Sequence, residues 1–145
     1  MRLEHRVTTP ASPAEVWALL GDLAAWPAFE LFLRSVRGAH GPAAVGQRLM
    51  GRVRLSTVSI PIDVLEVVPE ERLVVLVHTA PGLRERLAFD LTPSLRRGTD
   101  VRLSLSVEGL LALPAVLPLW LAGGLTARVL AAVADAQARK VRRAA

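Results

Sequence analysis

The sequence predicts an α+β fold, in which a curved antiparallel sheet of seven strands, with two short helices, wraps around a long C-terminal helix. Three observations support this fold class. A segment with strand alternation opens the chain, six further strand-like segments follow at short spacing, and an apolar segment with helical periodicity ends it. Connections this short exclude parallel crossovers, so we expect each strand to pair antiparallel with the strand before it.

Length and composition indicate a single domain, residues 1–145, with 52% hydrophobic residues and one core. Cysteine is absent, which excludes disulfides, thiolate metal sites and a cysteine nucleophile. The three histidines lack metal-ligand spacing and no nucleotide-binding glycine motif is present, so we expect neither a metal nor a cofactor. No signal peptide is visible, and we expect a cytoplasmic protein.

The net charge of +5 does not predict a nucleic-acid partner, because the basic residues are spread over the chain and interleaved with acidic ones. The exception is ARKVRR at 138–143. Cations at this place are typical of a helix C-terminus, and a contact with phosphate or a membrane is the alternative. The sequence leaves open whether the protein is a monomer or a homodimer.

The first segment, RLEHRVTT at 2–9, alternates as a strand and places His5 on the same side as Leu3 and Val7. ASPAEVWALLGD follows with helix-start signals: Ser12 as N-cap, Pro13 at the first helical position and Glu15 three residues after the cap. A second short helix, capped by Asp22, is expected to end near Trp26 because Pro27 disfavours a helical residue before it.

Six strands are then predicted at 33–38, 47–55, 57–68, 72–79, 83–92 and 99–108. One face of these strands is the more apolar and needs a cover. The inward residues are expected to be Leu49, Val53 and Leu55; Val58, Ile60, Ile62 and Val64; Leu83, Leu87, Phe89 and Leu91; and Val101, Leu103, Leu105 and Val107.

The cover is a helix expected over residues 115–142. Its apolar side is predicted to hold Leu121, Leu125, Val129, Ala132, Val133 and Ala136. The uncharged segment 109–127 precedes Arg128, but two prolines, two adjacent glycines and the preceding strand argue against a transmembrane helix. We expect this segment to line or close a cavity, as a lid or as the site of a transient membrane contact.

These segments resemble the START-like, helix-grip (SRPBCC) superfamily, which includes the polyketide cyclase/dehydrase and lipid-transport proteins. The resemblance covers nearly the whole chain. SPAEVWALLGDLAAWPAF at 12–29 is similar to the family's opening motif, VLEVVPEERL at 64–73 to its strand and turn, and GTDVRLSLSVEG at 98–109 to its Gly-Thr strand. The resemblance implies a hydrophobic cavity between the sheet and the long helix, and it is specific for the fold rather than for one chemistry.

Three residues are candidates for proton transfer in such a cavity. Glu85 shares the inward parity of Leu83 and Leu87, and a desolvated carboxylate has a raised pKa; a Glu paired with an inward Arg, or turned to the rim, is the alternative. His5 is the second candidate or a histidine packed at the sheet edge. His78 is the third, although its apolar surroundings leave its face undecided.

The expected contacts with a ligand come from the helical segments and the strands. Trp26 and Phe29 are placed at the cavity entrance by the resemblance, or else belong to the core. Arg37 has an uncertain register that allows an inward position. The full set of expected ligand contacts is Trp26, Phe29, Arg37, Phe89, Leu117, Trp120, Leu121 and Leu125.

Two functions remain open. In the first, the protein is a cofactor-free cyclase or dehydratase that folds a polyketide-like or aromatic precursor and moves protons with Glu85 and His5. In the second, the same cavity carries a lipid, a quinone or another apolar metabolite without changing it. The hydrophobic small molecule is the only partner that either function requires.

Overall fold

The structure has the element order that the sequence predicts: one strand, two short helices, six strands and one long helix. The computed structural model describes residues 2–110 and 112–144, and of residues 112–117 it describes the backbone alone. The strands are β1 (Arg2–Thr9), β2 (Leu33–Arg37), β3 (Arg48–Val53), β4 (Ser59–Val68), β5 (Arg72–Ala80), β6 (Leu83–Pro93) and β7 (Thr99–Glu108). The helices are α1 (Pro13–Leu20), the 3₁₀ helix η1 (Leu23–Ala28) and α2 (Ala112–Ala144).

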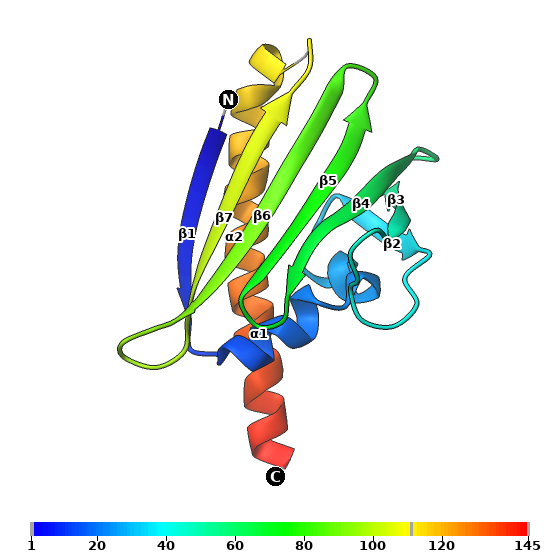
Figure 1. The fold of residues 1–145 in the computed structure, drawn as a ribbon. Coiled ribbons are helices and arrows are strands. Elements are labelled where there is room, and N and C mark those ends of the chain that lie inside the picture. Colours follow the sequence, from blue (N-terminus) through cyan, green and yellow to red (C-terminus); the bar gives the residue numbers. More distant parts are fainter. Residues whose placement is uncertain (1, 111, 145) are drawn as a thin grey trace.

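All seven strands form one antiparallel sheet in the order β1-β7-β6-β5-β4-β3-β2 (Figure 1). From β3 to β7 each strand pairs with the strand before it, as predicted. The predicted pairing of β2 with β1 is wrong, because β1 pairs with β7 at the opposite edge. Between β1 and β2 the chain runs through α1 and η1 across one end of the sheet, and so enters β2 at the far edge (Figure 1).

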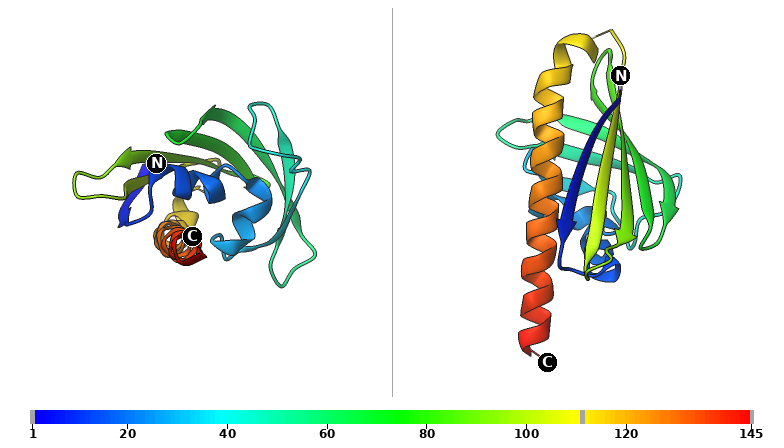
Figure 2. Two further views of the ribbon diagram at one scale, coloured as in Figure 1. Left: turned by 90° about the horizontal axis from the view of Figure 1, so that it is seen from below. Right: turned by 90° about the vertical axis from the view of Figure 1, so that its left-hand side faces the viewer.

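The sheet curves around the helices, so its concave face is the buried one (Figure 2). The predicted inward side chains of β6 and β7 are buried or half-buried, and Phe89 and Leu103 are fully buried. Leu55 and Val58 depart from the prediction: they are 100% and 54% exposed. Both lie between the end of β3 and the start of β4, beyond the part of the sheet that the helices cover.

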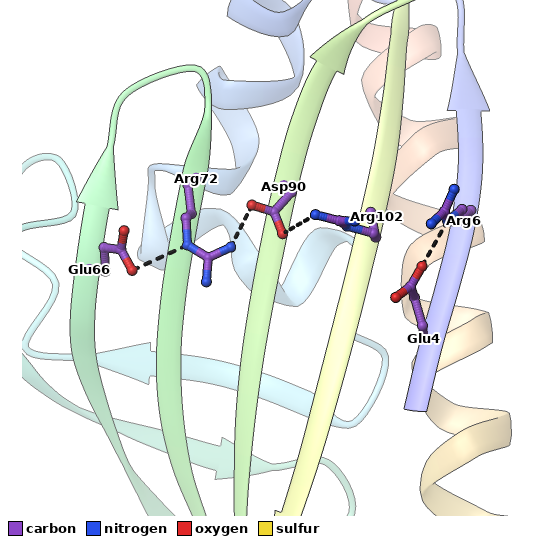
Figure 3. Close-up of polar contacts among 6 residues, drawn as sticks. All are labelled: Glu4, Arg6, Glu66, Arg72, Asp90 and Arg102. Carbon is purple, nitrogen blue, oxygen red and sulfur yellow. Dashed lines mark hydrogen bonds and ion pairs between the residues drawn. The ribbon is translucent and has the colours of Figure 1, made fainter. Parts of the chain in front are cut away.

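The convex face carries a row of ion pairs that crosses the sheet (Figure 3). Arg72 of β5 lies 3.2 Å from Glu66 of β4 and 2.6 Å from Asp90 of β6, and Asp90 lies 3.5 Å from Arg102 of β7. Partly exposed pairs of this kind each add about 1 kcal/mol or less to stability. Their main consequence is that this face stays in water and only the concave face is left to build a core and a cavity.

The start of α1 is capped as predicted. Ser12 Oγ accepts from the Glu15 backbone N–H at 3.2 Å, and Glu15 Oε1 accepts from the Ser12 backbone N–H at 2.9 Å. The prediction that the next helix ends near Trp26 is wrong, because η1 continues through Pro27 to Ala28. A short 3₁₀ helix accommodates the proline because few of its N–H groups have a helical partner.

Two glycines of the last strand region are required by close backbone contacts. Gly98 has φ +87 and Gly109 has φ +114, values that favour glycine. A Cβ atom on Gly98 would clash with the carbonyl oxygen of Thr9, and one on Gly109 with the carbonyl oxygen of Gly82. These contacts fix how β7 begins beside β1 and where the chain leaves the sheet for α2.

The buried side of α2 is not the stripe that the sequence predicts. Leu121 and Leu125 are 58% and 43% exposed, and Ala132 and Ala136 are also exposed. Val129 and Val133 are half-buried against the core. The buried residues are mostly small: Gly123, Thr126, Ala127, Leu130, Ala131, Ala134 and Ala138. Small side chains let the helix axis lie close to β1 and β7, and the larger leucines consequently turn outward.

Within the described residues, one helical stretch, Pro118–Ala144, is long and apolar enough by composition to span a membrane. In the structure one side of this stretch packs along β1, β7 and α1, and its last turns extend beyond the sheet (Figure 2). The basic residues near its end are exposed, and Arg142 Nε donates to the Ala138 carbonyl at 3.3 Å. This contact matches the expected helix C-terminus.

Candidate functional site

A cavity of about 310 Å³ lies between the concave face of the sheet, the loop before β2 and the first half of α2. Strands β3 to β7 supply an apolar wall that includes Ile62, Val77, Leu87 and Leu103. The described α2 residues that line it are Pro118, Leu119, Ala122, Gly123 and Thr126. The volume is at the lower end of the range for small-molecule sites in proteins.

The wall exists because β3 to β6 curve away from α2 while β7 and β1 stay close to it (Figure 2). At the close edge the gap is filled by the small residues of α2. Farther along the concave face, the inward side chains of Ile62 and Val77 meet the cavity rather than the helix. Helix packing at one edge and sheet curvature at the other therefore leave the space between them.

Glu85 of β6 lines this cavity, as its strand parity predicts. Its Oε2 accepts a short hydrogen bond from the Thr79 hydroxyl of neighbouring β5. Burial raises the pKa of the Glu85 carboxyl, and the hydrogen bond from Thr79 opposes part of that increase. A carboxyl with a raised pKa in an apolar wall can act as a general acid or base nearer to neutral pH than an exposed one.

A second carboxylate, Glu30, lines the same cavity from the loop between η1 and β2. Its Oε2 accepts from the Thr126 hydroxyl of α2 at 2.8 Å, and its Oε1 accepts from the Phe32 backbone N–H at 3.2 Å. Burial raises the pKa of Glu30, with a smaller contribution from the negative charge of Glu85. The two carboxylates therefore share one low-dielectric space.

An aromatic cluster forms one end of the cavity. Trp26 is 2% exposed and lines the cavity, and its Nε1 donates to the Leu20 carbonyl at 3.0 Å. Phe29 and Phe89 are fully buried behind it, with ring centroids 5.5 Å and 5.7 Å from that of Trp26. Trp26 thus contributes an apolar surface from inside, and the other two rings hold it in place.

The mouth of the cavity is marked by its exposed lining residues. Phe32, before β2, is 55% exposed, and Pro118 of α2 is also exposed. The cavity opens between these two elements. The hydrogen bond from Thr126 to Glu30 joins the same two elements deeper inside.

His5 is half-buried on β1 and is not among the residues that line the cavity. Its ring lies against α2: the ring centroid is 5.6 Å from that of Trp120, and a Cβ atom on Gly123 or Gly124 would come within 3.3 Å of the ring. Its Nε2 has no partner within the described part of the chain. The position is that of a histidine packed at the sheet edge.

His78 lies on the convex face of β5, away from the cavity. Its Nε2 is 2.9 Å from Asp63 Oδ2, and the other carboxylate oxygen of Asp63 accepts from Arg48 Nε at 2.7 Å. The bond from Arg48 is the main cause of the lowered pKa of Asp63, about 2, and His78 contributes less. The three side chains form a polar cluster in contact with water.

Of the other expected ligand contacts, Arg37, Trp120, Leu121 and Leu125 are not among the lining residues. Arg37 is exposed at the end of β2. Trp120, Leu121 and Leu125 are 45%, 58% and 43% exposed on α2. The side chain of Leu117 is outside the described residues.

Sequence reasoning did not identify Glu30, Thr126, Thr79 or Phe32. Glu30 and Phe32 stand in a loop, where periodicity gives no direction. Thr126 did leave a signal, because it is a single hydroxyl among the small residues of the buried side of α2, and a buried hydroxyl requires a hydrogen-bond partner.

The comparisons with known proteins agree with this fold. The family model described as polyketide cyclase / dehydrase and lipid transport matches residues 1–145. No curated protein gives a match. Among solved structures, protein MLL2253 from Mesorhizobium loti has 20% identity and a TM-score of 0.76, over 93% of this chain and 97% of that one.

Two further solved structures are similar. A START superfamily protein from Mycobacterium smegmatis has 16% identity and a TM-score of 0.69, over 97% of this chain and 98% of that one. DynU16, a putative protein in the dynemicin biosynthetic locus, has 21% identity and a TM-score of 0.64, over 89% of this chain and 46% of that one. At these identities the similarity shows a shared fold.

Proposed function

The chain belongs to the polyketide cyclase/dehydrase and lipid transport family, and from this premise we propose that it binds an apolar small molecule in the cavity and moves a proton on it with Glu85. The observation that carries the proposal is the carboxylate of Glu85 in a largely apolar cavity wall, oriented by Thr79 and with a pKa raised by burial. The neighbour from a biosynthetic locus supports a biosynthetic setting for such a reaction, and we propose a cytoplasmic location for it.

The reaction class that suits this site is an aldol-type cyclisation or a dehydration without a cofactor. In the dehydration, the Glu85 carboxylate removes a proton from the carbon next to a substrate carbonyl. The protonated carboxyl then donates this proton to the departing hydroxyl, which leaves as water, so Glu85 ends ionised as it began. The apolar wall holds the substrate in a folded conformation, which lowers the entropic part of the barrier.

Glu30 has a different proposed role. Both of its oxygens already accept hydrogen bonds, one from the loop and one from α2. We therefore assign proton transfer to Glu85 and a positioning role at the mouth to Glu30. His5 lies outside the cavity and is not needed for this step, so we expect His5→Ala to leave the rate unchanged.

A base-catalysed reporter reaction tests the role of Glu85. Ring opening of 5-nitrobenzisoxazole begins with removal of one C–H proton and gives a coloured phenolate. We expect the protein to accelerate it, and Glu85→Gln to lower the rate about 100-fold. The matched control is Glu108→Gln, because Glu108 is exposed and lies 3.7 Å from Arg84, the residue next to Glu85. An equal rate in wild type and Glu85→Gln would refute the assignment.

Binding in the cavity is tested separately with 1-aminoanthracene, whose fluorescence rises in an apolar site. Ala122→Phe places a ring into the cavity and should weaken binding about tenfold or more. Ala136→Phe is the control, since Ala136 is exposed on the same helix. Comparable loss of binding in both variants would mean that the dye binds elsewhere.

A carrier of an apolar metabolite is the second candidate. One observation favours it: the exposed Trp120, Leu121 and Leu125 lie on α2 directly beside the cavity-lining residues of that helix. An apolar surface next to a cavity mouth suits transfer of a ligand from a lipid bilayer. A protein that binds 1-aminoanthracene through the cavity, exchanges it with phosphatidylcholine vesicles and leaves the reporter reaction unaccelerated would be a carrier.

A further inference from the structure

The polar side chains among the described lining residues are few, and they are glutamates and threonines. Among the described lining residues they are Glu30, Thr79, Glu85 and Thr126, arranged as two pairs in which a threonine hydroxyl donates to a carboxylate. The indole N–H of Trp26 is already used by the Leu20 carbonyl. Arginine, lysine and histidine are missing from this described lining, although the chain as a whole has a net charge of +5.

The hydrogen bonds use the donors of these side chains and leave acceptors for a ligand, of which Glu85 Oε1 is the carboxylate oxygen without a donor among the described residues. Both oxygens of Glu30 are engaged, by the Phe32 N–H and by the Thr126 hydroxyl. Glu85 Oε2 is engaged by Thr79, whose hydroxyl has only one proton to give. Glu85 Oε1 accepts from no group in the described residues. With Glu85 ionised, the free polar capacity of the cavity is therefore that of an acceptor.

Arg54, which lies near the mouth, does not supply a free donor to the cavity. Arg54 donates from Nε to the Leu31 carbonyl and from Nη2 to the Leu33 carbonyl, both at 3.0 Å. Its guanidinium is thus held by the backbone of the loop and of β2. An anion inside the cavity would meet Glu85 with no cation among the described lining residues to offset the repulsion, and it would also lose its own hydration.

We infer that the ligand of this cavity is an apolar molecule whose polar end is a hydrogen-bond donor, such as a phenol, an alcohol or an amine, and that Glu85 selects against apolar carboxylates and phosphates. A donor recovers its lost hydration in a hydrogen bond to Glu85 Oε1, whereas a carboxylate finds only another acceptor. The inference rests on the proposed function in one respect, that the ligand occupies this cavity.

Four probes on one naphthalene frame test the inference by displacement of 1-aminoanthracene. They are 1-naphthol, 1-naphthylmethylamine, 1-methylnaphthalene and 1-naphthoate. At about pH 7 we expect 1-naphthol to bind about tenfold or more tightly than 1-naphthoate, with 1-methylnaphthalene between them. The amine probe separates a cationic donor from a neutral one, and tighter binding than the naphthol would identify an ammonium as the preferred donor.

Two variants show whether Glu85 causes the selection. Glu85→Leu removes the acceptor, so 1-naphthol and 1-methylnaphthalene should bind within about twofold of each other. Glu85→Gln removes the charge and should improve binding of 1-naphthoate. Glu108→Gln should leave all four affinities unchanged. Should 1-naphthoate bind wild type as tightly as 1-naphthol, or the naphthol preference persist in Glu85→Leu, the inference is overturned. Failure of the proposed function looks different, because then Ala122→Phe would not affect any probe.

Discussion

The Thr126 hydroxyl donates a hydrogen bond of 2.8 Å to the Glu30 carboxylate and so joins the middle of α2 to the loop before β2. The two residues are 96 positions apart in the chain. Both residues line the cavity, so their contact links two of the elements that enclose it. The hydrogen bond therefore fixes the position of the loop before β2 relative to α2.

Removal of this hydrogen bond should destabilise the fold measurably. Thr126→Val keeps the shape of the side chain and removes the donor, leaving Glu30 with the Phe32 N–H alone. We expect the free energy of unfolding in urea to fall by about 1–2 kcal/mol. Thr92→Val is the control, since Thr92 is exposed on β6, and it should change stability by less than about 0.5 kcal/mol. Equal effects of both variants would contradict a role for this contact.

Glu85 should make stability depend on pH in the direction opposite to that of most carboxylates. Its pKa is raised in the folded protein, so the native state holds the proton more tightly than the unfolded chain does. Stability is therefore lost as pH rises from the ordinary value of 4.5 through the raised pKa. Glu85→Gln has no charge to bury, so it removes this loss of stability at high pH.

Urea unfolding at two pH values measures that effect. We expect Glu85→Gln to be more stable than wild type at about pH 8 and no more stable at about pH 3, where the carboxyl is almost fully protonated in both states. The exposed Glu108 provides the comparison, because Glu108→Gln should show no such gain. If the variant were less stable than wild type at both pH values, burial of the Glu85 carboxylate would not be destabilising, contrary to this prediction.

Asp63 should make stability depend on pH in the usual direction for a carboxylate. Its pKa of about 2, against 3.8 for the ordinary group, reflects chiefly the hydrogen bond from Arg48. The stability it contributes is present above 3.8 and is lost as pH falls toward about 2. Asp63→Asn should lower the free energy of unfolding by about 1 kcal/mol near pH 7. The difference should shrink in acid, and a difference constant from neutral pH to pH 2 would exclude the Arg48 pair as its source.

Gly109 should tolerate no side chain. Gly109→Ala introduces a Cβ atom against the Gly82 carbonyl at a φ of +114, and we expect a loss of about 3 kcal/mol or more, read from thermal or urea unfolding. Gly41→Ala is the matched control. Gly41 has φ +76 but nothing within 4 Å of its Cβ position, so the loss there should be about 1 kcal/mol. Similar losses at both sites would mean that conformation alone, and not the contact with Gly82, restricts Gly109.

Much of the fold could be predicted from local signals. The capping box of Ser12 and Glu15 and the inward parity of Glu85 depend on residues a few positions apart, and the structure shows both. The pairing of β1 with β7 could not be predicted in this way, because nothing near Arg2–Thr9 indicates a partner about 95 positions later. The expectation that each strand pairs with its predecessor therefore failed at this one place.

The outward-facing leucines of α2 show a second limit of prediction from the sequence. Leu121 and Leu125 are the more apolar residues, and a hydrophobicity pattern assigns them to the core. The helix instead buries Gly123, Ala127 and Ala131, because close approach to β1 and β7 requires small side chains. Hydropathy measures transfer from water, and it does not measure the space between two backbones.

By itself, the sequence determined the order of elements, the two faces of the sheet and the direction of Glu85, since each depends on the period of a strand or helix and on capping groups nearby. Only the tertiary structure decided the size of the cavity and the residues that line it. It brought Glu30 and Thr126 together with Glu85 and Thr79, placed His5 and His78 outside, and left Glu85 Oε1 without a donor among the described residues. The curvature of the sheet and the packing distance of α2 set that space, and both are sums over contacts between residues far apart in the chain.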